Sequence, residues 1–493
     1  MANTYQHGAF GLLGDSVAQN AIQAGTVPVY IGLAPVNLIK GYADKDIINI
    51  PVKLSDFLNA SKTIGYSTDW TNFSLCEAVG AHFDNKLGNI GPIYVVNVLD
   101  PDKHRKEEVT EFSVTFKNGV AEFKSDKVIL DTIAIADKVQ DTDFTVSYNF
   151  TSGKVILTSI AKTPIDGQVT GSYYEVTPEA ITEEDIIGAE VDGVYSGMKA
   201  VSLLYTRENQ VANLLSCLNF NTKKKVYNAM VTFCDKINGH WQAFCVADIP
   251  VKDGETAVDT FTKARTWRTT NGYDSERSEI FYPMAYDNAT ERIYHTSTLA
   301  IVESMRIDNV NDSIPMESCS NKVIPVTKQY FGADATNQGF DQVTASNELN
   351  AYGISTLVFW GGSWVLWGGH TAKYEFGKDI DVRAIDTHYM RMLFHCINGF
   401  QRRQASRIDK PFNRSLKNSI LNEEQEILDS YIAAGALLPG SKIVFLASEN
   451  STSDMINGDF IFDLPITVTP RAKSLTARVY YTDEGLASLV EEV

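Results

Sequence analysis

The glycine-rich stretch around Ser363 is the first candidate for nucleophilic chemistry. A nucleophile elbow needs the pattern G-x-S-x-G, because the backbone must turn sharply at the serine. Here Gly361 and Gly362 precede Ser363, but Val365 stands where the closing glycine is required. Serine, histidine and aspartate occur elsewhere without a spacing that indicates a catalytic triad. The sequence therefore predicts no catalytic residue.

The sequence also contains no residue pattern that indicates a metal-binding or phosphate-binding site. His388 and His395 are seven residues apart, whereas paired histidine ligands on a helix need i,i+4 spacing and a third ligand nearby. Residues 372–379 resemble the end of a phosphate-binding loop, but Asp379 replaces Ser or Thr and Ala372 replaces the first Gly. The six cysteines contain no C-x-x-C pair, which disfavours zinc and indicates a reduced, cytoplasmic chain. We expect no metal and no cofactor.

Composition limits the classes of partner. The chain has 493 residues, enough for two to four domains, with 44% hydrophobic and 21% charged residues. Its net charge of −18 disfavours a general nucleic-acid-binding protein, which needs a basic face. Residues 1–25 lack the basic start and continuous apolar run of a signal peptide. We therefore expect neither direct nucleic-acid binding nor membrane insertion.

One basic segment departs from this acidic composition. Residues 401–417 hold six positive side chains against Asp409 alone. The six are Arg402, Arg403, Arg407, Lys410, Arg414 and Lys417. Spacing alone favours a solvated helix end, where cations interact well with the helix dipole. The alternative is a docking surface for an acidic partner.

Buried strands and amphipathic helices alternate through most of the chain. Residues 27–33 and 92–99 are unbroken apolar runs, typical of strands covered on both faces. Residues 223–237 have apolar side chains at helical spacing, and residues 241–249 form the next predicted strand. The same criteria predict helices at 54–58 and 74–83 and a strand at 199–206. This alternation predicts an α/β core with a mostly parallel sheet.

A different pattern interrupts this core. From residue 109 to about 177 the chain is one short strand after another, and several alternate apolar with polar side chains. Residues 151–153, Thr-Ser-Gly, fit a hairpin turn. We therefore expect residues 104–188 to be an all-β domain inserted into the core.

The uncharged stretch at 355–372, STLVFWGGSWVLWGGHTA, is long enough to span a membrane. Its glycines disfavour a helix, since each costs ~1 kcal/mol relative to alanine. The apolar residues are mostly β-branched and aromatic and form two runs around Gly361-Gly362. The stretch therefore predicts a buried strand, a Gly-Gly turn and a second strand.

The two chain ends are built differently from the core. After predicted helices at 382–403 and 419–434, the chain continues in predicted strands at 460–470 and 475–482. Alternate residues of the last strand share one face: Leu475, Ala477, Val479 and Tyr481. Residues 4–13 are too glycine-rich to hold structure alone. An unpaired strand edge is normally covered, so we expect both ends to be completed by a neighbouring chain.

In order and spacing, these segments resemble contractile phage tail sheath proteins of the large kind with an inserted β domain. The resemblance covers nearly the whole length and rests on residues 5–10, 27–35, 143–160, 234–250, 278–285 and 349–372. One departure lies in the Gly-rich junction, where the family commonly has Arg before the Thr and this chain has His370.

The resemblance implies an α/β (α+β) multidomain fold. It places an N-terminal extended arm at 1–25, a discontinuous central α/β core at 26–103 and 189–345, the inserted β domain at 104–188, a C-terminal α/β domain facing the tail tube at 346–472, and a C-terminal arm strand at 473–493. The arm residues implied to contact other subunits are Tyr5, Phe10, Leu12, Leu475, Ala477, Val479 and Tyr481. The basic residues at 402–417 become candidates for facing an acidic tube.

The implied function is structural rather than enzymatic. Sheath subunits form six-fold rings stacked helically around a tail tube, and contraction drives the tube through the host envelope. The implied partners are further copies of the chain, the tube protein, and baseplate and tail terminator proteins, in a virion tail assembled in the host cytoplasm. Two alternatives stay open: an α/β hydrolase-like enzyme, and another lattice protein of a virion or cell surface.

Overall fold

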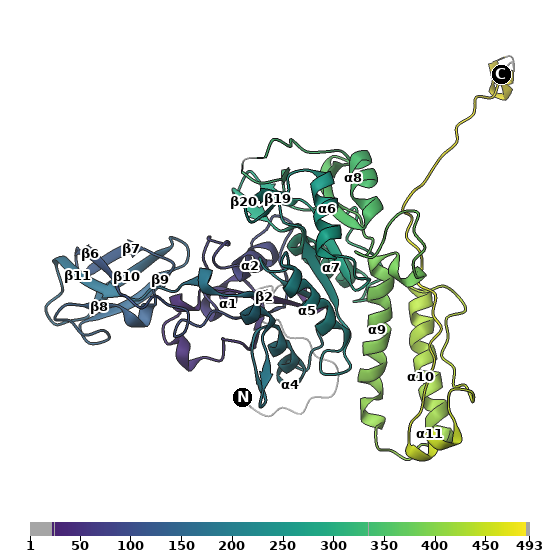
Figure 1. Cartoon of the computed structure of the whole chain (residues 1–493), viewed down its shortest axis with the longest axis horizontal. Helices are drawn as coiled ribbons and strands as arrows, with labels where there is room; N and C mark the ends of the chain where they lie inside the picture. The colour runs from purple at the N-terminus through teal and green to yellow at the C-terminus, as the bar shows by residue number, and fades with distance from the viewer. Residues whose placement is uncertain (1–21, 24, 334, 490–493) are drawn as a thin grey trace, which may run out of the picture. The chain divides into compact units, whose positions relative to one another are not determined.

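The computed structural model describes residues 22–23, 25–333 and 335–489 of the chain (Figure 1). Contacts between residues divide the chain into two compact units, Met1–Lys410 and Pro411–Val493. This division lies inside the predicted C-terminal domain rather than at its expected start near residue 346. The predicted N-terminal arm residues Tyr5, Phe10 and Leu12 lie outside the described residues.

The first unit is built on an eight-stranded sheet with the order β23-β22-β18-β15-β14-β2-β5-β3. Its strands are β2 (Pro28–Gly32), β3 (Pro51–Leu54), β5 (Ile93–Asn97), β14 (Leu214–Cys217), β15 (Phe244–Asp248), β18 (Ser278–Phe281), β22 (Ile354–Trp360) and β23 (Ser363–Trp367). The six inner strands are parallel, and β3 and β23 are antiparallel edges. Every residue of β2, β5, β14, β15 and β18 is buried. The predicted mostly parallel α/β core is confirmed.

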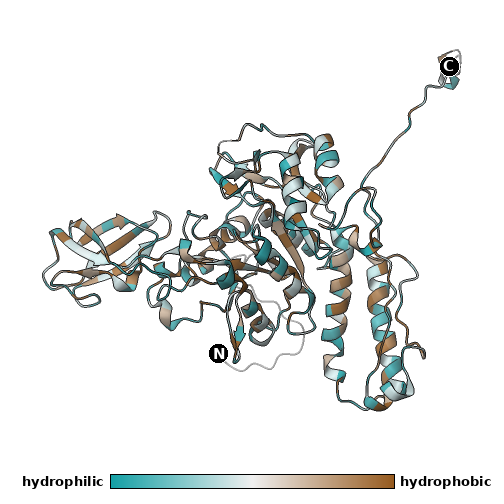
Figure 2. Ribbon diagram, viewed as in Figure 1, coloured by the Kyte–Doolittle hydropathy of each residue, from teal (hydrophilic) through white to brown (hydrophobic). Residues whose placement is uncertain are grey.

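Helices of the first unit bury their apolar sides against this core. They are α1 (Phe57–Thr63), α2 (Leu75–Phe83), α3 (Glu183–Ile187), α4 (Leu203–Glu208), α5 (Lys224–Asp235), α6 (Phe261–Asn271), α7 (Thr296–Val310), α8 (Gln342–Glu348) and α9 (Thr387–Gln404). In α5 the buried residues Val226, Met230 and Phe233 follow the predicted helical spacing. In Figure 2, apolar (brown) and polar (teal) residues likewise alternate along α9.

Short elements complete the first unit. The small sheets are β1 (Ile22–Gln23) with β4 (Ile90–Gly91), β12 (Glu190–Val191) with β13 (Val194–Tyr195), β16 (Lys252–Asp253) with β17 (Thr256–Ala257), and β20 (Arg292–Tyr294) with β19 (Met284–Asp287) and β21 (Lys328–Tyr330). Its 3-10 helices are η1 (Val36–Leu38), η2 (Tyr42–Asp44), η3 (Leu130–Thr132), η4 (Pro178–Ala180), η5 (Gly197–Ser202), η6 (Asn350–Tyr352), η7 (Val382–Ala384) and η8 (Ala405–Arg407).

The inserted segment forms two three-stranded sheets, β7-β10-β9 and β6-β11-β8. The strands are β6 (Thr110–Phe116), β7 (Val120–Lys124), β8 (Ala134–Ile135), β9 (Phe144–Asn149), β10 (Lys154–Ser159) and β11 (Gly167–Tyr173). They enclose a core of their own that includes Phe116, Phe144 and Leu157. Apolar and polar residues alternate along several of these strands, so one face of each strand packs into the core and the other faces water.

The insertion begins and ends at a short antiparallel contact between Arg105 and Val176. Residues beyond Val176 return to the main core, because Ile181 and Ile186 are buried in it. The structure therefore closes the insertion at Val176, earlier than the predicted end at residue 188. Conversely, Leu38, which lies in η1 outside the insertion, packs into the core of the insertion.

The C-terminal unit contains two helices and a pair of extended segments. The helices are α10 (Arg414–Ala433) and α11 (Thr452–Asn457), and a 3-10 helix, η9, spans Glu484–Leu489. The Asn413 side chain caps α10 by accepting a hydrogen bond from Leu416 N at 2.9 Å. Residues 436–444 run antiparallel to residues 463–469, with bridges Leu437–Val468 and Val444–Asp463.

Three local predictions are wrong. Residues 199–206, expected as a strand, form η5 and α4; Met198, Val201 and Leu204 are buried at helical spacing. The helix expected at 54–58 starts at Phe57, because Asp56 is its N-cap and Leu54 ends β3. The strand expected at 460–470 is reduced to isolated bridges.

Candidate assembly site

Residues 470–482, which hold the predicted arm strand and which we call the C-terminal arm from here on, carry the most exposed large apolar side chains among the described residues of the C-terminal unit. All of these residues are described, and none is in a helix or strand (Figure 1). Leu475 is 88% and Val479 92% exposed, and Ala477 and Tyr481 of the same predicted face are exposed as well. The arm contains Arg471, Lys473 and Arg478 and no acidic residue. An apolar, alternating segment left in water needs a partner strand to bury it.

A sheet edge that can accept such a strand lies in the same unit. Residues 463–469 bond residues 436–444 through alternate positions only: Val444 N donates to Asp463 O at 2.9 Å and Leu438 N to Thr467 O at 2.8 Å. The intervening backbone groups therefore face the other side. Within the described chain, the N–H groups of Leu464, Ile466 and Val468 have no hydrogen-bond partner. We call residues 464–468 the open edge.

The predicted basic residues fall on both sides of the boundary between the two units. Arg402 and Arg403 end α9, and Arg407 and Lys410 follow it, whereas Arg414 and Lys417 lie in the first turn of α10. The exposed members of the set are Arg402, Lys410 and Arg414. Others also serve their own unit: Arg407 Nη1 donates to Gln404 Oε1 at 2.8 Å, and Lys417 Nζ lies 5.5 Å from the centre of the Phe445 ring.

The hairpin of β22 and β23 confirms the strand, Gly-Gly turn and strand expected at 354–367. Gly361 and Gly362 have φ values of 60° and 87°, the left-handed region that a two-residue turn of this kind requires. β22 pairs with β18, so the hairpin extends the central sheet. Its base is buried, but its tip is exposed, unlike the fully buried pair that the sequence predicted.

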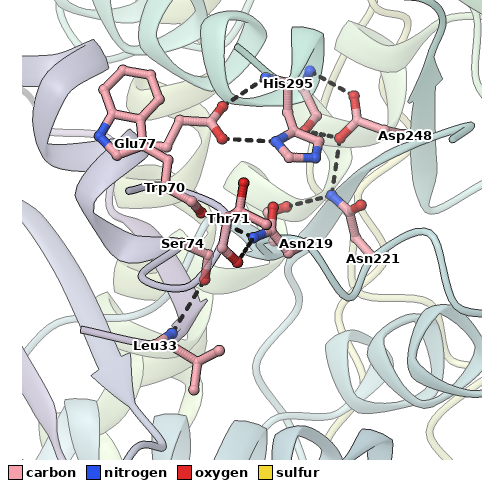
Figure 3. Close-up of polar contacts among 11 residues, drawn as sticks. Leu33, Trp70, Thr71, Ser74, Glu77, Asn219, Asn221, Asp248 and His295 are labelled. Carbon is pink, nitrogen blue, oxygen red and sulfur yellow. Dashed lines mark hydrogen bonds and ion pairs between the residues drawn. The ribbon is translucent and has the colours of Figure 1, made fainter. Parts of the chain in front are cut away.

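A buried polar cluster offers the strongest competing interpretation, a catalytic centre (Figure 3). His295, the residue before α7, bonds Glu77 of α2 twice: its N–H donates to Oε1 and its Nδ1 contacts Oε2, both at 2.7 Å. Asp248, at the end of β15, accepts from Ser297 N at 3.0 Å, from the Ser297 hydroxyl, and from Asn221 Nδ2 at 3.1 Å. The cluster thus contains an acid, a histidine, a serine and a second acid.

The geometry of this cluster indicates a helix anchor. A catalytic serine needs the histidine as the acceptor of its proton, but the Ser297 hydroxyl donates to Asp248. Ser297, Asp248 and Glu77 are all buried, so a substrate has no access to them. The two carboxylates instead bind N–H groups at the N-terminus of α7, where the helix dipole favours negative charge. Burial raises the pKa of Asp248, against the opposing effects of His295 and the Ser297 hydrogen bonds.

The usual ligand position of such a fold is also filled by the chain itself. Doubly wound sheets bind ligands outside the carboxyl ends of the strands where the strand order reverses, here between β2 and β14. Asn219, just after β14, donates to the carbonyls of Trp70 and Thr71, each at 3.1 Å (Figure 3). Leu33 N, just after β2, donates to the Ser74 hydroxyl at 3.2 Å. The loop before α2 therefore occupies this position.

The His295–Glu77 pair predicts a pH-dependent stability. Burial opposes the imidazolium, but the charge and hydrogen bond of Glu77, with Asp248, raise the pKa of His295 to about 9. The pKa of histidine in the unfolded chain is about 6.5, so the folded state binds the proton on His295 more tightly than the unfolded state does. The pair should add about 2–3 kcal/mol to the free energy of unfolding below pH 6.5 and lose it as pH rises through 9. Urea unfolding at several pH values should show this slope.

The variant His295→Asn is the matched control for that experiment. It should unfold at lower urea at pH 6, and its deficit should shrink towards zero by pH 10. A deficit that is independent of pH would show that His295 acts through packing alone.

The histidines of α9 form no metal site. His388 is fully buried, and burial lowers the pKa of His395 to about 4. In the part of the chain that the structure describes, no three His, Cys, Asp or Glu side chains are placed to hold a metal ion. A search of the described helices also finds none with the length and apolar character to cross a bilayer.

His370 in the glycine-rich junction ties β23 to the start of α9. Its Nδ1 lies 2.8 Å from Ile385 O and 2.9 Å from Asp386 Oδ1, and its ring stacks on Tyr374 with centres 3.7 Å apart. Thr387 N, at the start of α9, donates to Gly369 O at 3.0 Å. The junction is a packed joint between the sheet and α9.

No family model and no curated protein matches the sequence. Solved structures match the fold over nearly the whole chain. The baseplate of the anti-feeding prophage (AFP), 6-fold symmetrised, matches with a TM-score of 0.56 and 13% identity, covering 97% of this chain and 99% of that chain.

Two sheath complexes in the contracted state match as well. The sheath of the extracellular contractile injection system PVC gives a TM-score of 0.52 at 11% identity, covering 98% of this chain and 100% of that chain. The AFP helical sheath gives 0.52 at 12% identity, with 96% and 99% covered. The chain therefore has, from the central sheet through the C-terminal unit, the fold of contractile sheath proteins.

Proposed function

We propose that the chain is the structural subunit of a contractile sheath, in a phage tail or a phage-derived injection particle. It polymerises helically around a tail tube and contracts to drive the tube through the host envelope. The observation that carries this proposal is the exposed, acid-free arm in a unit that also has an open sheet edge. The arm lacks a partner strand, and the open edge lacks a strand to pair with it. If the arm of each copy pairs with the open edge of the next copy, both are satisfied and the assembly can grow without limit.

Strand addition explains how such a sheath holds together. A head-to-tail contact that does not close on itself produces a helix, and an arm that adds a strand to the next copy is such a contact. A strand of about six residues forms ~5 hydrogen bonds of ~0.5–1.5 kcal/mol each. A linking arm outside the folded units would let subunits move as bodies during contraction without breaking these bonds.

The partners follow from this role. We infer a six-fold helical assembly of the chain with itself, a tube protein inside it, and baseplate and tail terminator proteins at its ends. The chain would act without an active site, cofactor or metal, because contraction is a change between two packings of one assembly. Sedimentation of the purified full-length chain tests the proposal: it should polymerise with rising concentration. A chain that stays monomeric, or one serine labelled by a hydrolase probe, would favour the enzyme alternative.

The open edge gives a sharper test of strand addition. Ile466→Pro removes the outward N–H of Ile466, and proline cannot donate to a ladder. We expect the critical concentration for polymerisation to rise at least tenfold, with the melting temperature nearly unchanged. Ile466→Thr keeps the N–H and is the matched control. If both variants polymerise alike, the arm does not bind at this edge.

The basic residues at the end of α9 and just after it provide a test of the tube contact. Reversing Arg402, Arg403 and Arg407 to Glu should weaken co-assembly with an acidic tube, because like charges then face each other. Polymers formed without a tube should be unaffected. Reversing three exposed lysines elsewhere, Lys45, Lys236 and Lys252, to Glu changes the net charge by the same amount and is the control. Equal loss of both kinds of polymer would assign the basic segment to contacts between sheath subunits.

A further inference from the structure

The tip of the β22–β23 hairpin presents aromatic rings to solvent. Phe359 is 58% and Trp360 45% exposed, and the Gly361-Gly362 turn beside them is exposed too. The base of the hairpin is buried in the first unit, with Leu357 and Val358 fully covered. A folded domain rarely leaves large adjacent rings in water unless another surface covers them.

The rings are held in place before any partner arrives. Phe359 packs edge-on against Trp364 with ring centres 6.0 Å apart, and Trp360 packs against Trp367 at 5.8 Å. Trp367 is itself fixed, because its Nε1 donates to Ser346 Oγ of α8 at 3.1 Å. Binding through this tip would therefore cost little side-chain entropy. Rigid tryptophan and other aromatic anchors are the residues that dominate protein interfaces.

Net charge limits where a second copy of this acidic chain can approach. The chain has a net charge of −18, so two copies repel each other overall. Contact between copies is least opposed where a surface has no negative charge. Residues 349–372, which include the whole hairpin, contain no charged residue. The exposed tip of this uncharged stretch is thus a place where another copy can approach with less local repulsion.

We propose that the β22–β23 tip is a contact surface for a second copy of this chain, separate from the contact between the arm and the open edge. The inference rests on the proposed function, which surrounds each subunit with others. Phe359 and Trp360 would lose their exposure against a neighbouring subunit and stabilise one packing of the assembly. The arm would link the subunits, and the tip would fix how their first units lie against each other.

The experiment uses the full-length chain with Phe359 and Trp360 both changed to Ser. The matched control changes Val191 and Val194 to Ser, because these residues are also exposed apolar side chains at a hairpin, β12–β13. Critical concentrations come from sedimentation, folding from circular dichroism and melting. We expect the tip variant to fold normally and to need at least tenfold more protein to polymerise, and the control to change less than twofold. Acrylamide quenching of tryptophan should also fall when the wild type polymerises.

Three results would overturn the proposal. If the tip variant polymerises like the wild type, the tip is not a contact between copies, although the proposed function stands. If it polymerises normally alone but fails to assemble around the tube, the tip binds the tube protein instead. If the wild type itself never polymerises, the proposed function fails and the tip contact fails with it.

Discussion

A chain that ends after Ala472 is expected to be a folded monomer at concentrations where the full-length chain polymerises. Residues 474–481 have no hydrogen-bond partner within the described structure, and Leu475 and Val479 are almost fully exposed. Removing residues 474–481 therefore breaks no hydrogen bond within the described structure. The loss of ~5 hydrogen bonds per contact, at ~0.5–1.5 kcal/mol each, should weaken association by roughly two to five orders of magnitude.

The matched control ends after Thr482 and keeps the whole arm. It should polymerise like the full-length chain, which separates the arm from the acidic residues that follow it. Sedimentation and melting curves of the three proteins give the result. Deletion of residues 1–14 should have the same effect as loss of the C-terminal arm if both are linkers. Ordered polymers from either truncated chain would show that the missing arm is not required.

The buried ion pair between Asp308 of α7 and Arg391 of α9 should give the largest effect on stability. Asp308 Oδ2 contacts Arg391 Nη2 and accepts from the Thr26 hydroxyl at 2.5 Å, and both charged side chains are buried. Arg391→Met leaves a buried carboxylate without its cation, which costs about 3–5 kcal/mol. Urea unfolding should show this loss in the single variant.

The double variant Arg391→Met with Asp308→Asn decides the cause. Replacing both members of a buried pair is often nearly neutral, because the desolvation cost disappears with the charges. We therefore expect the double variant to recover most of the stability that the single variant loses. A double variant as unstable as the sum of both single changes would mean that the residues act through packing and not through their charges.

The sequence correctly predicted those helices, strands and turns that depend on the types and spacing of a few neighbouring residues. The Gly361-Gly362 turn, the apolar runs of β2 and β5, and the helical spacing in α5 are of this kind. The run at 199–206 failed, because a short apolar run fits a strand or a helix equally well and neighbouring packing decides. The signal for the helix was present at Met198, Val201 and Leu204, which are three residues apart.

Contacts between distant residues could not be predicted in this way. His295 lies 218 positions from Glu77, and no pattern in one sequence pairs them. A weaker signal existed for Asp248 and Asn219, because polar side chains directly after buried parallel strands gather at one edge of a sheet. Likewise, the strand predicted at 475–482 does not form in a single chain, because it has no pairing partner among the described residues.

Electron microscopy of the purified full-length chain at high concentration tests the central claim most directly. A sheath subunit with both arms should form hollow helical tubes of uniform diameter, with six-fold rotational symmetry in cross-section, without a tube protein as template. Averaged images should place the inserted β domain on the outer surface of these tubes. Flat lattices, closed shells, or particles that stay monomeric would contradict the account.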